Sequence, residues 1–271
     1  MILSRALIAL WLATSTLVIG AEAPAATIVL PRKAPIPQPS ERPAPPPEEA
    51  PAKPPVPTPR PDGETASEKP PEETPVPADP RSAEEPRSPL PAEEAACRQR
   101  LKALGVQFEA SEARHDENIG CALPYPLVVK TLGPAIGLEP EAEMNCRMAE
   151  AAARFMAGTV APTARSQLGA GLKSVSQASA YVCRPRHNRE KMSEHAFGNA
   201  LDIASFTLTD GTRVDVEAAP DQKAAGKFLA DIRKAACGPF KTVLGPGSDA
   251  DHAVHFHLDL EPRRNGGTFC Q

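Results

Sequence analysis

The pattern of apolar and polar positions divides the chain near residue 93 into two unlike parts. From about Pro24 to Glu94, Pro, Ala, Glu and Lys dominate and large apolar residues are few. Such a segment buries too little apolar area to offset the entropy lost on ordering. Beyond it, apolar residues recur at helical and strand spacings. The pattern therefore predicts a disordered Pro-rich segment over residues 21–92 and one folded domain over residues 93–271.

Helical spacing recurs in four stretches of the folded part, over residues 93–103, 140–157, 161–168 and 221–236. The second stretch is the clearest, because Met144, Phe155 and Met156 mark an apolar stripe and Gly158 provides an end. A methionine and aromatic stripe at helical spacing usually belongs to a core rather than to a cofactor contact. We therefore interpret this stripe as part of the core.

Short alternating or β-branched runs predict strands between these helices. They cover residues 106–108, 128–132, 175–183, 200–208, 212–216, 241–244 and 252–260. Asp210-Gly211 is a two-residue hairpin signal between two of these runs. The prolines within residues 120–127 indicate irregular chain or an edge strand. Helices and antiparallel strands are mixed without βαβ alternation, which favours an α+β fold.

Candidate chemistry is concentrated in two short motifs. His195 and Asp202 lie seven residues apart across a turn of small residues, and His255 and His257 lie two apart in an alternating run. Because side chains on a strand alternate between faces, the latter two histidines are expected on one face, roughly 7 Å apart. Imidazole nitrogens combined with a carboxylate oxygen suit a zinc ion (Zn2+) in tetrahedral geometry with room for water.

These motifs also carry a resemblance to a known superfamily. Ser193, His195, Gly198, Ala200 and Asp202 fit every fixed position of Ser-x-His-x-x-Gly-x-Ala-x-Asp, and the run from residue 255 to 257 fits a downstream His-x-His element. This combination resembles the zinc peptidases of lysostaphin, D-Ala-D-Ala peptidase and hedgehog type. The nearer resemblance, over about residues 97–270, is to the extensin-like C-terminal domain family, which joins a Pro-rich region to such a domain. It implies an antiparallel sheet that carries a zinc site and is flanked by helices.

Carried over position by position, the resemblance implies that His195, Asp202 and His257 bind zinc, with water in the fourth place. His255 would then act as the general base or stabilise the tetrahedral oxyanion. An alternative is a site of three histidines, His195, His255 and His257, with Asp202 orienting one of them; another alternative is an ion other than zinc. His115 and His187 are interpreted as structural. His252 is out of phase with His255 and His257 on a straight strand and is not expected to be a ligand, unless a bulge changes that phase.

Other residues near the motifs have supporting roles in this interpretation. Ser193 would cap the turn or support a ligand. Arg184 or Arg186 would bind a substrate carboxylate or a tetrahedral intermediate, or else both are solvated loop charges. One departure from several relatives is Val254, which stands where they carry a glutamate three residues before the last zinc histidine.

Two functions from different classes follow from the resemblance. The first is a zinc-dependent peptidase that acts on peptidoglycan cross-link or stem peptides. The second is a metal-containing module that binds the cell wall or has a structural role, without catalysis. The Ser193 to Asp202 motif and the His-x-His pair favour the first function, and Val254 favours the second.

The N-terminal residues indicate export. Arg5, the apolar stretch over residues 6–17 and the small residues Gly20, Ala21 and Ala23 have the order of a secretory signal peptide, which we assign to residues 1–20. The expected location is the periplasm or cell envelope of a Gram-negative bacterium, with membrane attachment only if the signal stays uncleaved. The Pro-rich segment would be a spacer that reaches about 200 Å when fully extended.

Charge and cysteine content bear on the expected partners and on the compartment of the protein. The net charge is −4 and no basic block stands out, so we expect no nucleic-acid partner; a monomer is expected. All six cysteines lie between Cys97 and Cys270 and none forms a Cys-x-x-Cys pair. Three structural disulfides in an oxidising compartment are the simplest interpretation, the alternative being one or two buried free thiols. The expected pairs are Cys97–Cys121, Cys146–Cys183 and Cys237–Cys270.

Overall fold

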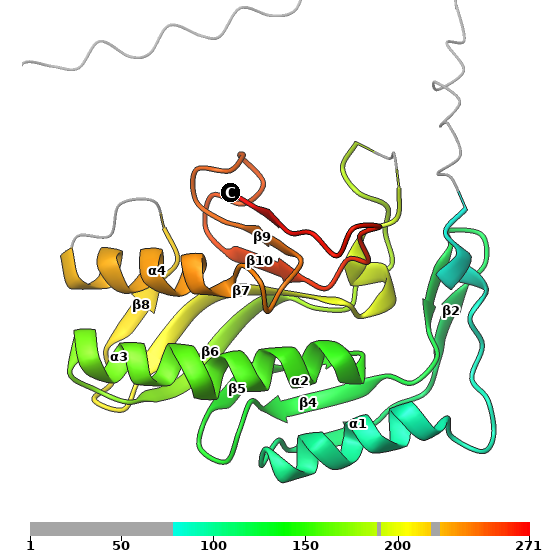
Figure 1. Cartoon of the computed structure of the whole chain (residues 1–271), viewed down its shortest axis with the longest axis horizontal. Coiled ribbons are helices and arrows are strands. Elements are labelled where there is room, and N and C mark those ends of the chain that lie inside the picture. The colour runs from blue at the N-terminus through cyan, green and yellow to red at the C-terminus, as the bar shows by residue number, and fades with distance from the viewer. Residues whose placement is uncertain (1–77, 189–190, 218–222) are drawn as a thin grey trace, which may run out of the picture. The chain divides into compact units, whose positions relative to one another are not determined.

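The computed structural model describes residues 78–188, 191–217 and 223–271 of the chain. The predicted signal peptide and the Pro-rich segment up to residue 77 lie outside the described residues. The arrangement of the described elements is drawn in Figure 1.

A large mixed sheet forms the centre of the domain. Its strands are β1 (Phe108–Ala110), β4 (Leu127–Thr131), β5 (Gly137–Met144), β6 (Leu172–Ser179), β7 (Ala200–Leu208), β8 (Arg213–Asp215), β9 (Thr242–Leu244), β10 (Phe256–Asp259) and β11 (Phe269–Cys270). They follow the order β1-β4-β5-β6-β7-β10-β9-β11, with β8 paired to β7. Neighbours are antiparallel, apart from the parallel pairs β5 with β6 and β9 with β11. A separate two-stranded sheet joins β2 (Arg114–Asp116) to β3 (Cys121–Leu123).

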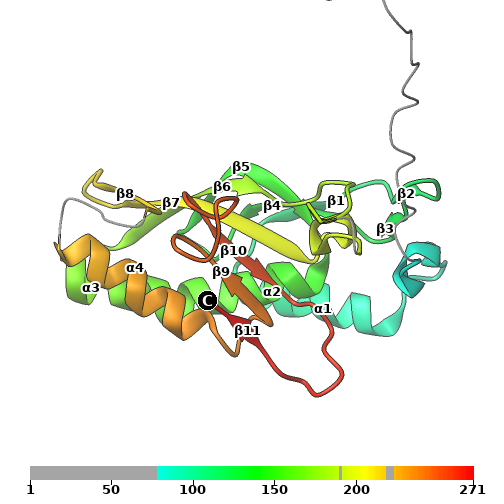
Figure 2. The same cartoon turned by 90° about the horizontal axis from the view of Figure 1, so that it is seen from above.

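Helices cover one face of this sheet (Figure 2). They are α1 (Ala92–Ala103), α2 (Cys146–Phe155), the π-helical turn η2 (Met156–Val160), α3 (Ala161–Leu168) and α4 (Lys223–Ala236). One hydrophobic cluster fills the space between helices and sheet; in it Phe206 of β7 meets Phe228 of α4 edge to face, with ring centroids 5.5 Å apart. This two-layer arrangement confirms the predicted α+β fold.

The longest predicted helix is wrong at both ends. Residues 140–144 belong to β5, where Ala142 and Met144 alternate into the core as strand residues do. The helix begins only after Asn145, whose side chain caps it by accepting a 2.8 Å hydrogen bond from the Met148 backbone N–H. Gly158 does not end the helix, because η2 carries the chain directly into α3.

The same region contains a βαβ unit, whereas the sequence pattern predicted no βαβ alternation. Parallel strands need a long crossover connection, and α2, η2 and α3 supply it between β5 and β6. Pro140 has no backbone N–H to donate, and its position in β5 does not need one. It follows Glu139, the last residue paired with β6, and lies in the irregular stretch of the pairing with β4 between Gly137 and Ala142. Within residues 120–127, predicted to be irregular or edge-like, residues 121–123 form β3 of the separate two-stranded sheet.

Several predicted elements match closely. The strand over residues 200–208 is β7, and the turn at Asp210-Gly211 leads into β8 as predicted. The strand predicted over residues 241–244 is β9, and the C-terminal helix is α4, although its predicted first residues, 221 and 222, lie outside the described residues.

All six cysteines form disulfides, but two of the predicted pairs are wrong. Cys97 of α1 is bonded to Cys146 at the start of α2, and Cys121 of β3 is bonded to Cys183. The reason is the packing of α1 against α2, which spacing along the sequence does not reveal. The predicted Cys237–Cys270 bond is confirmed. Three disulfides are typical of a protein from an oxidising compartment.

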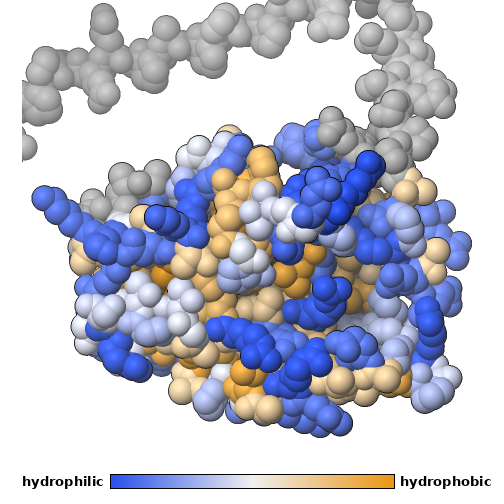
Figure 3. Space-filling model, viewed as in Figure 1, coloured by the Kyte–Doolittle hydropathy of each residue, from blue (hydrophilic) through white to orange (hydrophobic). Residues whose placement is uncertain are grey.

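One face of the described surface is mostly polar. Figure 3 shows hydrophilic residues over much of one face and a narrower hydrophobic band near its middle. Large apolar side chains that are exposed among the described residues are Leu90, Ile119, Val182, Val254 and Phe269. None of the described helices has the length and apolar character needed to cross a membrane.

Candidate metal centre

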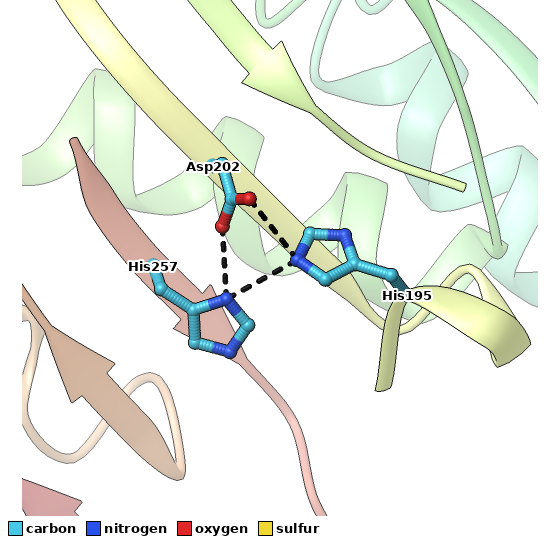
Figure 4. A group of neighbouring side chains, drawn as sticks. All are labelled: His195, Asp202 and His257. Carbon is cyan, nitrogen blue, oxygen red and sulfur yellow. Dashed lines mark hydrogen bonds and ion pairs between the residues drawn. The ribbon is translucent and has the colours of Figure 1, made fainter. Parts of the chain in front are cut away.

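Three predicted ligands, His195, Asp202 and His257, meet in one buried group (Figure 4). His195 Nε2 lies 3.2 Å from Asp202 Oδ2 and 3.2 Å from His257 Nδ1. His257 Nδ1 lies 2.8 Å from Asp202 Oδ1. The three potential ligand atoms are therefore close enough to share one metal ion, as two nitrogens and one oxygen.

Pairing of β7 with β10 positions two of the three side chains. Asp202 and His257 are direct cross-strand partners in this antiparallel pair, so their side chains project from the same face of the sheet. Their neighbours Leu201 and Leu258 are paired next to them and point to the opposite face, into the core beneath the helices. The metal centre therefore lies on the sheet face that the helices leave uncovered.

The third side chain comes from a short 3-10 helix, η3 (Glu194–Phe197), directly before β7. Ser193 caps this turn, and its Oγ accepts a hydrogen bond of 3.4 Å from the His195 backbone N–H. The carbonyl of His195 in turn accepts from the backbone N–H of Val182 at 3.3 Å. These contacts fix the direction in which the His195 ring enters the site.

Gly198 is required at the end of this turn. Its φ of +57° lies in the left-handed region, and an added Cβ would lie 2.8 Å from Leu123 Cδ2 and 2.9 Å from the backbone nitrogen of Asn145. The Gly198 carbonyl also accepts a 2.8 Å hydrogen bond from that nitrogen. The glycine of the motif thus lets η3 pack tightly against the start of α2.

Hydrogen bonds on the outer side of each imidazole select the tautomer. His195 Nδ1 donates to the carbonyl oxygen of Ala180, which leaves Nε2 to face the group. His257 Nε2 donates to Asp259 Oδ2 at 3.0 Å, which leaves Nδ1 to face the group. A carbonyl or carboxylate behind a histidine is the usual support of a metal-binding imidazole, because it fixes the ring and raises its basicity.

The charges of the group favour a cation. Burial raises the pKa of Asp202, but His195 and His257 outweigh this and hold it well below its ordinary value. Burial lowers the pKa of His257, but the hydrogen bonds to Asp202 and Asp259 prevail and raise it to about 9. Two buried carboxylates around two imidazoles therefore attract positive charge, and the donor set fits a divalent metal ion.

Comparison with known proteins agrees with these motifs. A family model described as the extensin-like protein C-terminus matches residues 95–271. The chain belongs to this family. Neither the search of curated proteins nor the search of solved structures found a match.

In this extensin-like domain His255 lies beside the metal group rather than in it. The strand predicted over residues 252–260 is shorter, because β10 begins at Phe256 and the residues before it form turns. Asp249 shortens the strand. Its Oδ1 accepts a 3.0 Å hydrogen bond from the backbone N–H of His252, and this bond stabilises a turn instead of a strand. His255 Nε2 lies 3.8 Å from Asp202 Oδ2. Burial lowers the pKa of His255, and Asp202 opposes this shift.

His252 also reaches the site, although its predicted strand phase placed it elsewhere. Its ring centroid lies 5.2 Å from that of His255 and 5.6 Å from that of His257. Its Nδ1 is held by Asp249 Oδ1 at 2.7 Å. Val254 is 66% exposed. The turn therefore brings His252 and His255 to the pocket, whose wall also includes Asp249 and Asp251.

An open pocket of about 690 Å³ adjoins the metal group of the extensin-like domain. The histidines of the group lie in its wall, and Arg184 and Arg186 lie at its edge. Arg186 Nη2 pairs with Glu261 Oε1 at 3.2 Å, whereas Arg184 is exposed and donates to the backbone oxygen of Pro185 at 3.4 Å. Ser193, which caps η3, also lines this pocket.

Sequence reasoning missed two carboxylates that support the ligands of the extensin-like domain. Asp259 lies two residues after His257 on β10, so the same alternation used for the histidines could have placed it on the same face. Glu194 lies inside the motif at a variable position and is buried. Nothing in the sequence pattern indicates its partner, Arg81, which lies far away along the chain.

Proposed function

We propose that the extensin-like domain is a zinc-dependent peptidase that acts on peptides of the bacterial cell wall. The observation that carries this proposal is the convergence of His195 Nε2, His257 Nδ1 and an Asp202 oxygen in a buried group beside an open pocket. Three protein ligands that leave a position for water are typical of catalytic rather than structural zinc sites.

The donor set favours zinc over other common ions. Calcium and magnesium prefer oxygen ligands, whereas two imidazole nitrogens with one carboxylate oxygen suit zinc. When bound, zinc lowers the pKa of its water and polarises a carbonyl group. His195 and His257 are held in the required tautomers by Ala180 and Asp259.

His255 is the proposed acid–base residue. It lies at the pocket, 3.8 Å from Asp202 Oδ2 through its Nε2, and outside the three-residue group. A partly exposed imidazole can accept a proton from the attacking water and deliver it to the leaving amine, or donate a hydrogen bond to a developing oxyanion. In this proposal it replaces the glutamate that Val254 does not supply.

Two features support the proposed substrate class: the family resemblance and the exposed Arg184 at the pocket. Cross-link and stem peptides of peptidoglycan end in, or carry, free carboxylates, and a guanidinium group binds a carboxylate with two parallel hydrogen bonds. Arg184 is proposed for this role because it is exposed at the pocket, whereas Arg186 already pairs with Glu261.

Location in the periplasm or cell envelope is part of the same proposal. The three disulfides fit an oxidising compartment, and a secreted chain with a long Pro-rich spacer can carry its domain to the wall. We propose that the domain acts there as a monomer with peptidoglycan peptide as its partner.

A second candidate function is a metal-containing module that binds the cell wall without catalysis. Val254 favours it, since this exposed side chain offers no base at the position where several relatives carry a glutamate. The two functions differ in whether bound peptide is turned over.

The test is incubation of the purified mature chain with cross-linked muropeptides, in metal-free and zinc-loaded form, followed by mass spectrometry of the products. The peptidase predicts new peptide fragments only in the zinc-loaded sample and none with His195→Ala. Binding of muropeptides without any fragment would contradict the peptidase and support the binding module.

A further inference from the structure

A short segment that precedes the family-matched region contacts the metal-binding motif. The 3-10 turn η1 (Pro80–Ala83) lies before residue 95, where the family match begins. From it, Arg81 Nη1 and Nη2 each donate a 2.8 Å hydrogen bond to a different oxygen of Glu194. Glu194 is the residue directly before the ligand His195.

Arg81 is the counter-charge of a buried carboxylate. The side chain of Glu194 is 2% exposed, whereas that of Arg81 is 24% exposed. A buried carboxylate without a partner is strongly unfavourable, and removal of one partner from such a pair leaves the other uncompensated. A two-pronged guanidinium contact also fixes the direction of the carboxylate, not only its charge.

Glu194, held in position by Arg81, also contacts the residues that follow His195 in the motif. Its Oε2 accepts from Asn199 Nδ2 at 2.6 Å, and Asn199 Oδ1 accepts from Asn145 Nδ2 at 3.1 Å. The backbone carbonyl of Glu194 accepts from the Asn199 N–H at 3.0 Å, which closes the turn around His195. The direction of the Glu194 side chain therefore bears on the backbone that presents the His195 ring.

The segment itself is firmly attached. The Arg81 guanidinium lies 3.9 Å above the ring centre of Phe197, the last residue of η3. Ser82 donates from its hydroxyl to the carbonyl of Gly120, and its own carbonyl contacts His115 Nε2 at 3.0 Å. In Figure 1 this turn, drawn in cyan, lies next to β2. His115, interpreted as structural, thus holds the segment in place.

We propose that Arg81 is a positioning residue of the metal centre and that residues 79–83 belong to the functional domain. By pairing with Glu194, Arg81 compensates the charge of this buried carboxylate and fixes the turn η3 that presents His195. The proposal rests on the proposed metal site but not on peptidase activity.

The test uses the full mature chain and its affinity for Co²⁺, whose visible absorption spectrum reports ligand geometry. Arg81→Met is expected to weaken Co²⁺ binding by about tenfold, the lower end of the effect of residues that support metal ligands, and to change the spectrum. Arg81→Lys keeps the charge and is expected to recover part of the affinity. The matched control is Arg154→Met, which breaks a pair with Glu150 on α2, on the helix-covered side of the sheet.

Unchanged Co²⁺ affinity and spectrum in Arg81→Met would overturn the proposal, even if the melting temperature fell, because a merely structural role would affect stability alone. If Arg81→Met does not fold, the comparison is made with Glu194→Gln and the double variant Arg81→Met/Glu194→Gln. Removal of Arg81 is expected to cost less affinity in the Glu194→Gln background, and equal cost in both backgrounds would overturn the proposal. An unaltered chain that binds no Co²⁺ would instead overturn the proposed metal site, and this inference with it.

Discussion

Asp202 and His257 lie directly opposite each other on β7 and β10, with Oδ1 and Nδ1 2.8 Å apart. The strand register alone therefore brings together two side chains that are 55 residues apart in sequence. His195 is added by the turn that precedes β7. A candidate metal site built on paired strands is rigid, because Asp202 and His257 can move apart only if the centre of the sheet is disturbed.

Asp259 is expected to strengthen metal binding without contacting the ion. Asp259→Asn keeps the shape of the side chain but removes the charge behind His257 Nε2, so the imidazole becomes a weaker donor. Metal affinity should fall by about 10–100-fold, as measured by competition with a chromophoric chelator. The control is Asp251→Asn, an exposed carboxylate at the same pocket. Equal affinities for the two variants would argue against the support role.

His255 and His257 are expected to differ although they are two residues apart. His257→Ala should strip most of the metal, because three protein ligands become two. His255→Ala should retain the metal, and turnover of muropeptides should fall by roughly 10²–10⁴-fold, as expected for loss of an acid–base group. Metal analysis and product analysis of both variants check this. Loss of metal from His255→Ala would show that His255 is a ligand and would contradict this division of roles.

The disulfides are expected to be complete and in the observed pairs. Denatured protein from its native compartment should show no titratable thiol before reduction, and peptide mapping should recover Cys97 with Cys146 and Cys121 with Cys183. Reduction should lower the free energy of unfolding by about 2–5 kcal/mol for each bond. Six free thiols in such a sample would contradict both the pairing and the oxidising location.

Glu261 is expected to make the domain sensitive to acid. Burial raises the pKa of this carboxyl, but Lys191, Arg186 and Arg263 outweigh burial and hold the pKa below its ordinary value of 4.5. Such a group contributes stability that is fully present above the unfolded-state pKa and is lost as the pH falls through the lower folded-state value. Between about pH 5 and pH 2, the unaltered domain should therefore lose more stability than Glu261→Gln does.

Chemical denaturation at several pH values measures this difference. The matched control is Glu112→Gln, which alters an exposed carboxylate and should leave the pH profile unchanged. Parallel pH profiles for Glu261→Gln and the unaltered domain would show that Glu261 does not contribute to the acid sensitivity.

The candidate metal group could be predicted from the sequence because its motifs are local and resemble those of a known superfamily. The motif from Ser193 to Asp202 contains a cap, a glycine turn and a strand start, each recognisable within a few residues. The alternation of side chains along a strand also predicted that His257 lies on the same face as the residues two positions away from it. The pattern did not predict that the strand begins only at Phe256. The Asp249 side chain forms an Asx turn with the backbone of His252, and this hydrogen bond replaces strand pairing there.

Features that depend on distant contacts could not be predicted in this way. The apolar spacing around Met144 fits a helix as well as a strand, and the cap at Asn145 decides between them. The Cys97–Cys146 disulfide follows from the packing of α1 on α2. The pair of Arg81 with Glu194 joins residues 113 positions apart, and no local period reports it.

The central claim is that His195, Asp202 and His257 together hold one zinc ion. Elemental analysis of the mature chain, purified without chelators, tests this most directly when the unaltered protein is compared with Asp202→Asn and with the control Asp210→Asn, which alters an exposed turn residue. We expect close to one zinc per chain in the unaltered protein and the control, and little in Asp202→Asn. Absence of any divalent metal from the unaltered protein, or equal metal content in all three, would contradict the account.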